Sequence, residues 1–153
     1  VCGEVVGVDF DEKLLQIARQ RGVYSDLMQR DIAAGLGFGE GAFDYIWASE
    51  ILEHMPNLDR VDEWERICRK ALVITVPNPA SPHFKEDETH ILEYSVSSFR
   101  TFFSGRRDFA YRVRGLGFNQ VHFNLPLRKI STWLLWKCPW LSPTLAVIGR
   151  RKG

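Results

Sequence analysis

The sequence is poor in cysteine and has no long uninterrupted run of apolar residues. Three cysteines (Cys2, Cys68 and Cys138) among 153 residues are too few and too scattered for a disulfide framework. We therefore expect reduced thiols and a cytoplasmic location. No stretch of 18 apolar residues occurs, which argues against a membrane-spanning helix. With 45% apolar and 25% charged residues, the composition is that of a globular protein and excludes a disordered or collagen-like chain.

Acidic residues are almost missing from the last third of the chain. Residues 1–99 carry nine Lys or Arg and 18 Asp or Glu, a net charge of −9. Residues 100–153 carry 11 Lys or Arg and a single acid, Asp108, a net charge of +10. Either the two halves of one domain neutralise each other, or the basic third faces an anionic partner.

Tryptophan and lysine are interleaved near the C-terminal end. Residues 129–141 (KISTWLLWKCPWL) hold three of the five tryptophans and two lysines. This pattern is typical of interfacial segments and of lids over lipid-like substrates, and an apolar insertion packed on the sheet is the alternative. We expect peripheral contact with an anionic membrane through residues 128–152. No nucleic-acid-binding motif is present, so we expect no nucleic-acid partner.

Strand and helix patterns alternate along the chain. The predicted strands are 5–8, 25–30, 43–48, 72–76, 118–125 and 144–149. The predicted helices are 12–21, 58–71, 97–103 and 108–115. Asp11 is the expected N-cap of the first helix, and Gly22 is the expected left-handed residue after it. This alternation predicts an α/β layered sheet, and we interpret residues 1–153 as one domain.

Polar residues follow three of the predicted strands. Asp9 ends the first, Asp31 the second, and Ser49-Glu50 the third. In open α/β sheets, ligands bind beyond the carboxyl ends of the strands. A carboxylate at the first position can accept hydrogen bonds from both hydroxyls of a ribose, and one at the second can accept from the amine of adenine. Together they predict an adenosine pocket, although each aspartate alone would also serve as a helix cap or turn residue.

Several stretches resemble, in order and spacing, the middle of a class I S-adenosylmethionine-dependent methyltransferase. They are VVGVDFDEKLLQIARQRG, RDIAAGLGFGEGAFDYIWASEILEHM and ALVITVPNP. THILEYSVSSFRTFF is similar to the small-molecule branch that includes the ubiquinone and menaquinone biosynthesis methyltransferases. GLGFNQVHF and TLAVIGRRKG resemble the sixth and seventh strands. The resemblance implies a Rossmann-like sheet with helices on both faces and an antiparallel last strand.

The same resemblance implies the cofactor and the reaction. The cofactor would be S-adenosylmethionine, and its methyl group would pass by in-line displacement to a small-molecule or lipid-linked acceptor, with catalysis mainly by positioning. The positions implied to contact the cofactor are Asp9, Phe10, Asp31, Ile32, Ser49 and Glu50. The two acids would hold the ribose hydroxyls and the adenine amine. Phe10 would lie against the adenine ring, and the backbone of Ile32 would meet the same ring. Ser49 and Glu50 would lie near the methionine part.

Histidines are the candidates for catalysis. His54, in Leu-Glu-His, matches a recurrent histidine near the transfer site and is our candidate general base, because the unperturbed pKa of histidine lies near neutrality. A packing role is the alternative for His54. His90 is the second candidate base. His83, Asp87 and His90 do not have a zinc-ligand spacing, so we expect no metal.

The chain departs from the family pattern at its beginning. The family's first strand and its glycine-rich loop would lie before Val1, so we expect residues 1–153 to be part of a methyltransferase domain, a fragment that begins in its interior. Two further readings remain open. One is an NAD(P)-type dinucleotide-binding oxidoreductase, which also places an acid after its second strand. The other is a non-catalytic, truncated remnant with a binding role.

Overall fold

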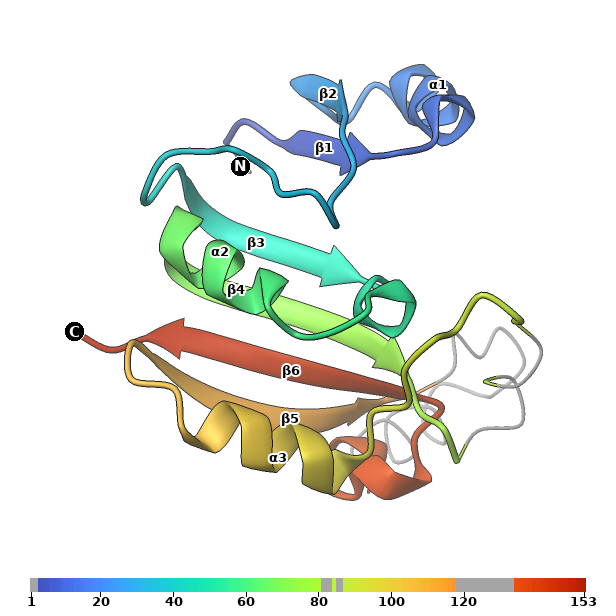
Figure 1. Ribbon diagram of the computed structural model, residues 1–153, viewed down its shortest axis with the longest axis vertical. Coiled ribbons are helices and arrows are strands. Elements are labelled where there is room, and N and C mark those ends of the chain that lie inside the picture. Colours follow the sequence, from blue (N-terminus) through green and yellow to red (C-terminus); the bar gives the residue numbers. More distant parts are fainter. Residues whose placement is uncertain (1–2, 81–83, 85–86, 118–133) are drawn as a thin grey trace. The chain divides into compact units, whose positions relative to one another are not determined.

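The computed structural model describes residues 3–80, 84, 87–117 and 134–153. The chain forms two compact units, Val1–Phe38 and Gly39–Gly153. Figure 1 shows the elements of each unit in sequence colours. No helix in the described ranges is long and apolar enough to cross a bilayer.

The first unit is a strand–helix–strand motif. Strand β1 (Val6–Asp9) pairs in parallel with β2 (Asp26–Gln29), so that Asp9 lies opposite Gln29. Helix α1 (Glu12–Arg21) connects the two strands. The Asp11 carboxylate accepts a hydrogen bond from the Lys13 amide, and Gly22 ends the helix with φ of 64°, as the sequence predicts.

The second unit is built on a mixed four-stranded sheet. Its elements are β3 (Phe43–Ser49), the 3₁₀ turn η1 (Leu52–His54), α2 (Arg60–Ile67), β4 (Cys68–Pro77), α3 (Val96–Ser104), β5 (Phe109–Leu116), the 3₁₀ turn η3 (Pro139–Leu141) and β6 (Thr144–Arg151). The strand order is β3-β4-β6-β5. Strands β3 and β4 are parallel, whereas β6 is antiparallel to both of its neighbours. The predicted α/β class with an antiparallel last strand is thus confirmed.

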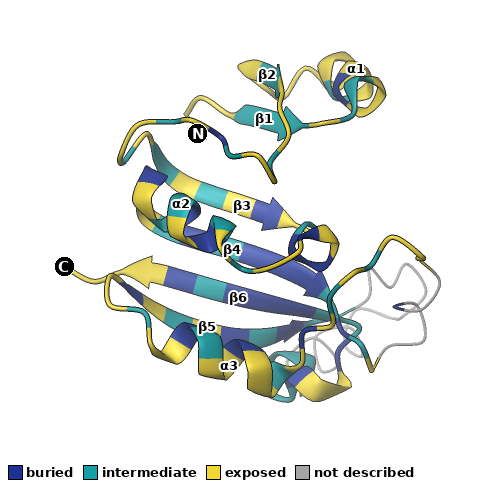
Figure 2. Ribbon diagram, in the orientation of Figure 1, coloured by how far each residue is buried: buried dark blue, intermediate teal, exposed yellow. Residues whose placement is uncertain are grey.

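Helices α2 and α3 lie on the same face of this sheet (Figure 1). Trp64 of α2 and Phe99 and Phe103 of α3 are at most 3% exposed. Figure 2 shows that burial is densest on β4, β6 and the inner sides of these two helices. The Tyr111 hydroxyl of β5 donates a 2.7 Å hydrogen bond to the Glu65 carboxylate of α2, which ties helix to sheet.

Two predicted helices differ from the structure, one in its type and one in its end. Residues 108–115 were expected to be helical, but they form strand β5, in which buried Phe109 and Val113 alternate with exposed Ala110 and Arg112. Alternation between buried and exposed side chains with a period of two is typical of a strand that is covered on one face. Helix α2 ends at Ile67, because residues 68–71 extend β4 and pair with the start of β3. The strand predicted at 118–125 lies outside the described residues.

Candidate functional site

Two acids end neighbouring parallel strands of the first unit. Asp9 is the last residue of β1, and Asp31 follows β2 by two residues. One oxygen of Asp9 accepts a 2.8 Å hydrogen bond from the Asp11 amide, and one oxygen of Asp31 accepts a 2.8 Å hydrogen bond from the Ala33 amide. These turns fix the direction of each carboxylate and use one of its two oxygens. The other oxygen remains as an acceptor for a ligand.

The residues that follow the two acids provide apolar surface. Phe10 is 73% exposed, although its ring is large and apolar. Its backbone carbonyl accepts a 3.0 Å hydrogen bond from the Gln29 side chain, which ties the residue after β1 to the end of β2. Ile32 is half-buried. An exposed aromatic ring directly after a strand-end carboxylate is a suitable surface for a flat, polar-edged ring such as a purine.

In the second unit, Ser49 and Glu50 lie at the carboxyl end of β3. The Ser49 and Thr75 hydroxyls are 2.9 Å apart, and the Glu50 amide donates a 2.9 Å hydrogen bond to the Thr75 carbonyl. Glu50 has φ of 52°, in the left-handed region that residues with a Cβ seldom adopt. The chain therefore turns sharply at this point, and Glu50 is exposed. Structurally unusual backbone at a strand end is common in binding sites.

His54 and His90 come together in the second unit. Their ring centroids are 5.1 Å apart. The His54 Nδ1 atom lies 3.1 Å from the Thr89 carbonyl oxygen, and His90 Nδ1 lies 2.8 Å from the Phe84 carbonyl oxygen. A carbonyl can only accept, so Nδ1–H of each ring donates, and in the neutral imidazole Nε2 then holds the lone pair. A neutral imidazole of this tautomer is the form that a general base requires.

Glu53 is a member of this cluster that the sequence analysis missed. The residue is 1% exposed, and neither carboxylate oxygen has a hydrogen-bond partner among the described residues. Burial raises the pKa of Glu53 from 4.5 to about 7. Nearby Glu50 and Asp87 raise the pKa further, whereas the backbone amide of Glu53 itself and His90 lower it. The only sequence signal was the position of Glu53 beside His54 in a turn before Pro56.

Two other groups near Glu53, Tyr94 and Asp87, also have shifted pKa values. Burial, and then the charge of Glu53, raises the pKa of Tyr94 to about 12. Hydrogen bonds from the side chain and the amide of Thr89 lower the pKa of Asp87, which is exposed. The three ligand atoms offered by Glu53, His54 and His90 lie within 4.8 Å of one another.

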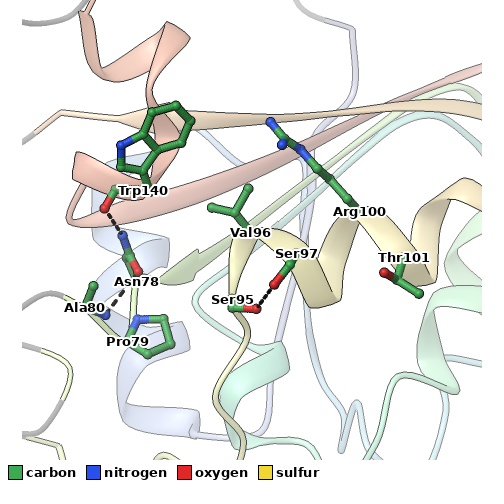
Figure 3. Close-up of a pocket in the computed structure, with 9 residues that line it drawn as sticks. All are labelled: Asn78, Pro79, Ala80, Ser95, Val96, Ser97, Arg100, Thr101 and Trp140. Atoms are coloured by element: carbon green, nitrogen blue, oxygen red, sulfur yellow. Dashed lines mark hydrogen bonds between the residues drawn. The ribbon is translucent and has the colours of Figure 1, made fainter.

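A pocket of about 580 Å³ opens beside the carboxyl end of β4 (Figure 3). Asn78, Val96 and Trp140 form part of its wall, and Arg100 of α3 supplies a positive charge. The Asn78 side-chain amide donates a 2.6 Å hydrogen bond to the Ser142 carbonyl, which holds this wall in place. The pocket is therefore a mixed site, with apolar surface and one cation.

Some of the predicted residues are not described. Cys2 and His83 lie outside the described residues, as does part of the tryptophan-rich segment, 129–133. Cys68 and Cys138 are free thiols.

Residues 1–74 match a family model described as a methyltransferase domain. The match covers slightly less than half of the chain. No curated protein matches it. The matched range includes all six positions that the sequence analysis assigned to the cofactor, and His54 as well.

Solved structures show the same fold at low sequence identity. A SAM-dependent methyltransferase from Archaeoglobus fulgidus is 18% identical, with a TM-score of 0.59, and the match covers 95% of this chain and 75% of that one. An S-adenosylmethionine-dependent methyltransferase from Mesorhizobium loti is 17% identical, with a TM-score of 0.64 and coverage of 97% and 80%. The plantazolicin methyltransferase BpumL, solved with SAH, is 14% identical, with a TM-score of 0.60 and coverage of 99% and 67%. The chain has the fold of these methyltransferases.

Proposed function

We propose that this chain binds S-adenosylmethionine and takes part in methyl transfer to a small-molecule or lipid-linked acceptor. The observation that carries the proposal is the arrangement of Asp9, Phe10 and Asp31 at the carboxyl ends of two adjacent parallel strands. Each acid keeps one oxygen outside its own turn, and the Phe10 ring is exposed. These groups fit the adenosine half of the cofactor. When bound, the cofactor would supply a methyl group on a positively charged sulfur.

The chain's own groups would mainly bind and orient. The free oxygen of Asp9 would accept from the ribose hydroxyls, and Asp31 would accept from the adenine amine. The assignment of Ile32 to the adenine ring, and of Ser49 and Glu50 to the methionine part, stays a prediction. His54 is our proposed base for an acceptor that must lose a proton, because its Nε2 presents a lone pair and its side chain is 37% exposed. His90 is a weaker candidate, since only 10% of its side chain is exposed.

We infer that the acceptor enters the pocket beside β4. Trp140 and Val96 offer apolar surface, and Arg100 would attract an anionic group. Trp140 and its neighbour Leu141 are also more than half exposed, and Lys137 lies three residues before Trp140. Exposed tryptophan, leucine and lysine together suit peripheral contact with an anionic membrane, from which a lipid-linked acceptor could be taken.

The decisive experiment is a calorimetric titration with S-adenosylhomocysteine. We expect binding by the chain, loss of binding in Asp9→Ala, and unchanged binding in Asp26→Ala, which removes an exposed acid at the opposite end of β2. A titration with NAD(P) tests the oxidoreductase alternative. Binding of NAD(P) without binding of S-adenosylhomocysteine would refute the proposal.

Two finer predictions need their own tests. The predicted first strand and glycine-rich loop before Val1 are tested by repeating the titration with a chain extended upstream, for which we expect tighter binding. Equal affinity in both chains would count against that prediction. An activity assay would then test the alternative that the chain is a non-catalytic, truncated remnant with a binding role. For the membrane, we expect co-sedimentation with anionic vesicles at low salt and weaker association in Trp140→Ala. No enrichment with the vesicles would refute it.

A further inference from the structure

The pocket beside β4 has a wall that the fold holds in place. The side chain of Asn78, which is 5% exposed, donates to the Ser142 carbonyl oxygen at 2.6 Å and accepts from the Ala80 amide at 3.1 Å. The Asn78 amide also donates to the Pro143 carbonyl oxygen at 2.7 Å. These bonds connect the end of β4 to the segment that carries Trp140. The volume of about 580 Å³ lies within the roughly 300–1,000 Å³ of small-molecule sites.

Helix α3 contributes two rows of side chains to this pocket. Val96 and Arg100 are four residues apart, as are Ser97 and Thr101, and all four line the pocket. Residues four apart lie on the same face of a helix, about 6 Å apart along its axis. Figure 3 shows these side chains along α3, together with Trp140 of η3. One row therefore joins apolar surface to a cation, and the next row supplies two hydroxyl groups.

Arg100 is a cation that no acid neutralises within the described part of the chain. Its neighbours three and four positions away on the helix are all uncharged, which excludes an ion pair within α3: they are Val96, Ser97, Phe103 and Ser104. Among the described residues of other elements, none forms an ion pair with Arg100 either. Arg106, just after the same helix, differs, because it forms ion pairs with Asp62 and Glu65.

The charge of the pocket therefore comes from one side chain. Among the described residues that line it, Arg100 alone is charged. An anionic group of a ligand would meet no acid there, and it would not have to displace an existing partner of the guanidinium. Arg100 is also exposed, so its charge is open to a ligand that enters from solvent.

We propose that the pocket selects an acceptor that carries a carboxylate or phosphate group beside an apolar chain or ring, and that Arg100 is the residue that selects it. A guanidinium can donate two parallel hydrogen bonds to either anion. Trp140 and Val96 would cover the apolar part of the acceptor. The inference rests on the proposed function, because it calls the ligand a methyl acceptor. The binding of an anionic amphiphile can nevertheless be measured by itself.

The experiment is a titration of the chain at pH 7 with three probes that share one apolar chain. Octanoate and octyl phosphate are anionic, and octanamide is uncharged. Calorimetry measures the affinities, and ¹H–¹⁵N NMR of the Val96, Ser97 and Arg100 amides locates the site. The test variants are Arg100→Gln, which removes the charge, and Arg100→Lys, which keeps it. Arg107→Gln is the matched control, since it removes an exposed arginine seven residues later that does not line the pocket.

We expect the better of the two anions to bind roughly tenfold more tightly than octanamide, because a hydrogen bond between charged groups is stronger than a neutral one. The difference should shrink at high salt, since Arg100 is exposed. Arg100→Gln should lose this preference and still bind octanamide as the parent does. Arg100→Lys should keep part of the preference, because it retains the charge without the planar fork. The control should match the parent.

Four outcomes would overturn the inference. They are no binding of either anion at millimolar concentration, equal affinity for the anions and octanamide, chemical-shift changes confined to residues outside the pocket, and an unchanged preference in Arg100→Gln. The relative affinity of octanoate and octyl phosphate distinguishes a carboxylate acceptor from a phosphate-bearing one.

The titration with S-adenosylhomocysteine separates this inference from the proposed function. Anion binding that depends on Arg100, in a chain that does not bind S-adenosylhomocysteine, would keep the anion site and refute its role in methyl transfer. Binding of S-adenosylhomocysteine without any preference for the anionic probes would overturn the inference about the acceptor and leave the proposed function standing.

Discussion

Asp9 and Glu53 are both carboxylates near the carboxyl end of a strand, but their surroundings differ. Asp9 is half-exposed, and a backbone amide occupies one of its oxygens. Glu53 is buried, and among the described residues neither of its oxygens receives a hydrogen bond. The first carboxylate is ready to bind a neutral ligand through hydrogen bonds. The second carries a desolvation cost that only a proton or a cation relieves.

The largest effect is expected from Glu53→Gln, on stability. Below pH 4.5 the carboxyl is protonated in both the folded and the unfolded chain. Between pH 4.5 and 7 only the folded chain keeps the proton, so the free energy of unfolding falls as the pH rises, and above pH 7 it falls no further. The difference amounts to about 3 kcal/mol. We expect Glu53→Gln to remove this loss, as measured by urea unfolding from pH 4 to 9 with EDTA present.

The groups that face Glu53 stay in place in this comparison. They are Glu50, His54, Asp87, His90 and Tyr94. The difference between parent and variant therefore isolates Glu53, and Glu93→Gln serves as the control. Parallel stability profiles for the parent and Glu53→Gln would show that the carboxyl is not desolvated.

The matching substitution in the first unit is Asp9→Asn, which should affect ligand affinity and leave stability almost unchanged. The amide oxygen can still accept from the Asp11 amide, so we expect the free energy of unfolding to change by less than about 0.5 kcal/mol. Affinity for S-adenosylhomocysteine should fall roughly 30-fold, because a hydrogen bond to a charged group contributes about 1.5–3 kcal/mol. Calorimetry measures the affinity, and urea unfolding measures the change in the free energy of unfolding. A large loss of stability with unchanged affinity would assign Asp9 a structural role.

Asp31→Asn should give a smaller loss of affinity, of roughly fivefold. Its proposed partner is one amine instead of two hydroxyls, and Asp31 is more exposed than Asp9, so water competes more strongly for the same bond. The titration series should also include an analogue that lacks the adenine amine. If Asp31 binds that amine, the variant and the parent should bind the analogue equally well.

Ser95→Ala should have the smallest effect, and it measures a purely structural polar contact. The Ser95 hydroxyl caps α3 by accepting a 3.1 Å hydrogen bond from the Ser98 amide. Its loss should lower the free energy of unfolding by about 1 kcal/mol, without altering S-adenosylhomocysteine binding. Ser97→Ala is the control, since it removes the 2.9 Å hydrogen bond between the Ser97 and Ser95 hydroxyls in the first turn of the same helix but leaves the capping hydroxyl of Ser95. Equal destabilisation by the two variants would show that the cap contributes little.

Local chemistry made much of the fold predictable. The Asp11 cap, the left-handed Gly22 and the β-branched run before Asp9 act within a few residues, so their effect can be read from the sequence. Strand β5 was missed because Phe-x-Tyr-x-Val is a short alternating pattern that basic residues interrupt. The burial of Glu53 depends on the distant segment around His90, and no local pattern reports such a contact.

The place of β6 in the sheet has a consequence for synthesis on the ribosome. Residues 144–151 are made after the other strands of the four-stranded sheet, yet they lie between β4 and β5. Arg151 also donates to the carbonyl oxygens of Glu65 and Cys68 at the end of α2. The chain emerges at about 5–20 residues per second, so β4 and β5 are synthesised before β6, the strand with which both pair. Until β6 is made, the edges that will pair with it are open to chaperones or to neighbouring nascent chains.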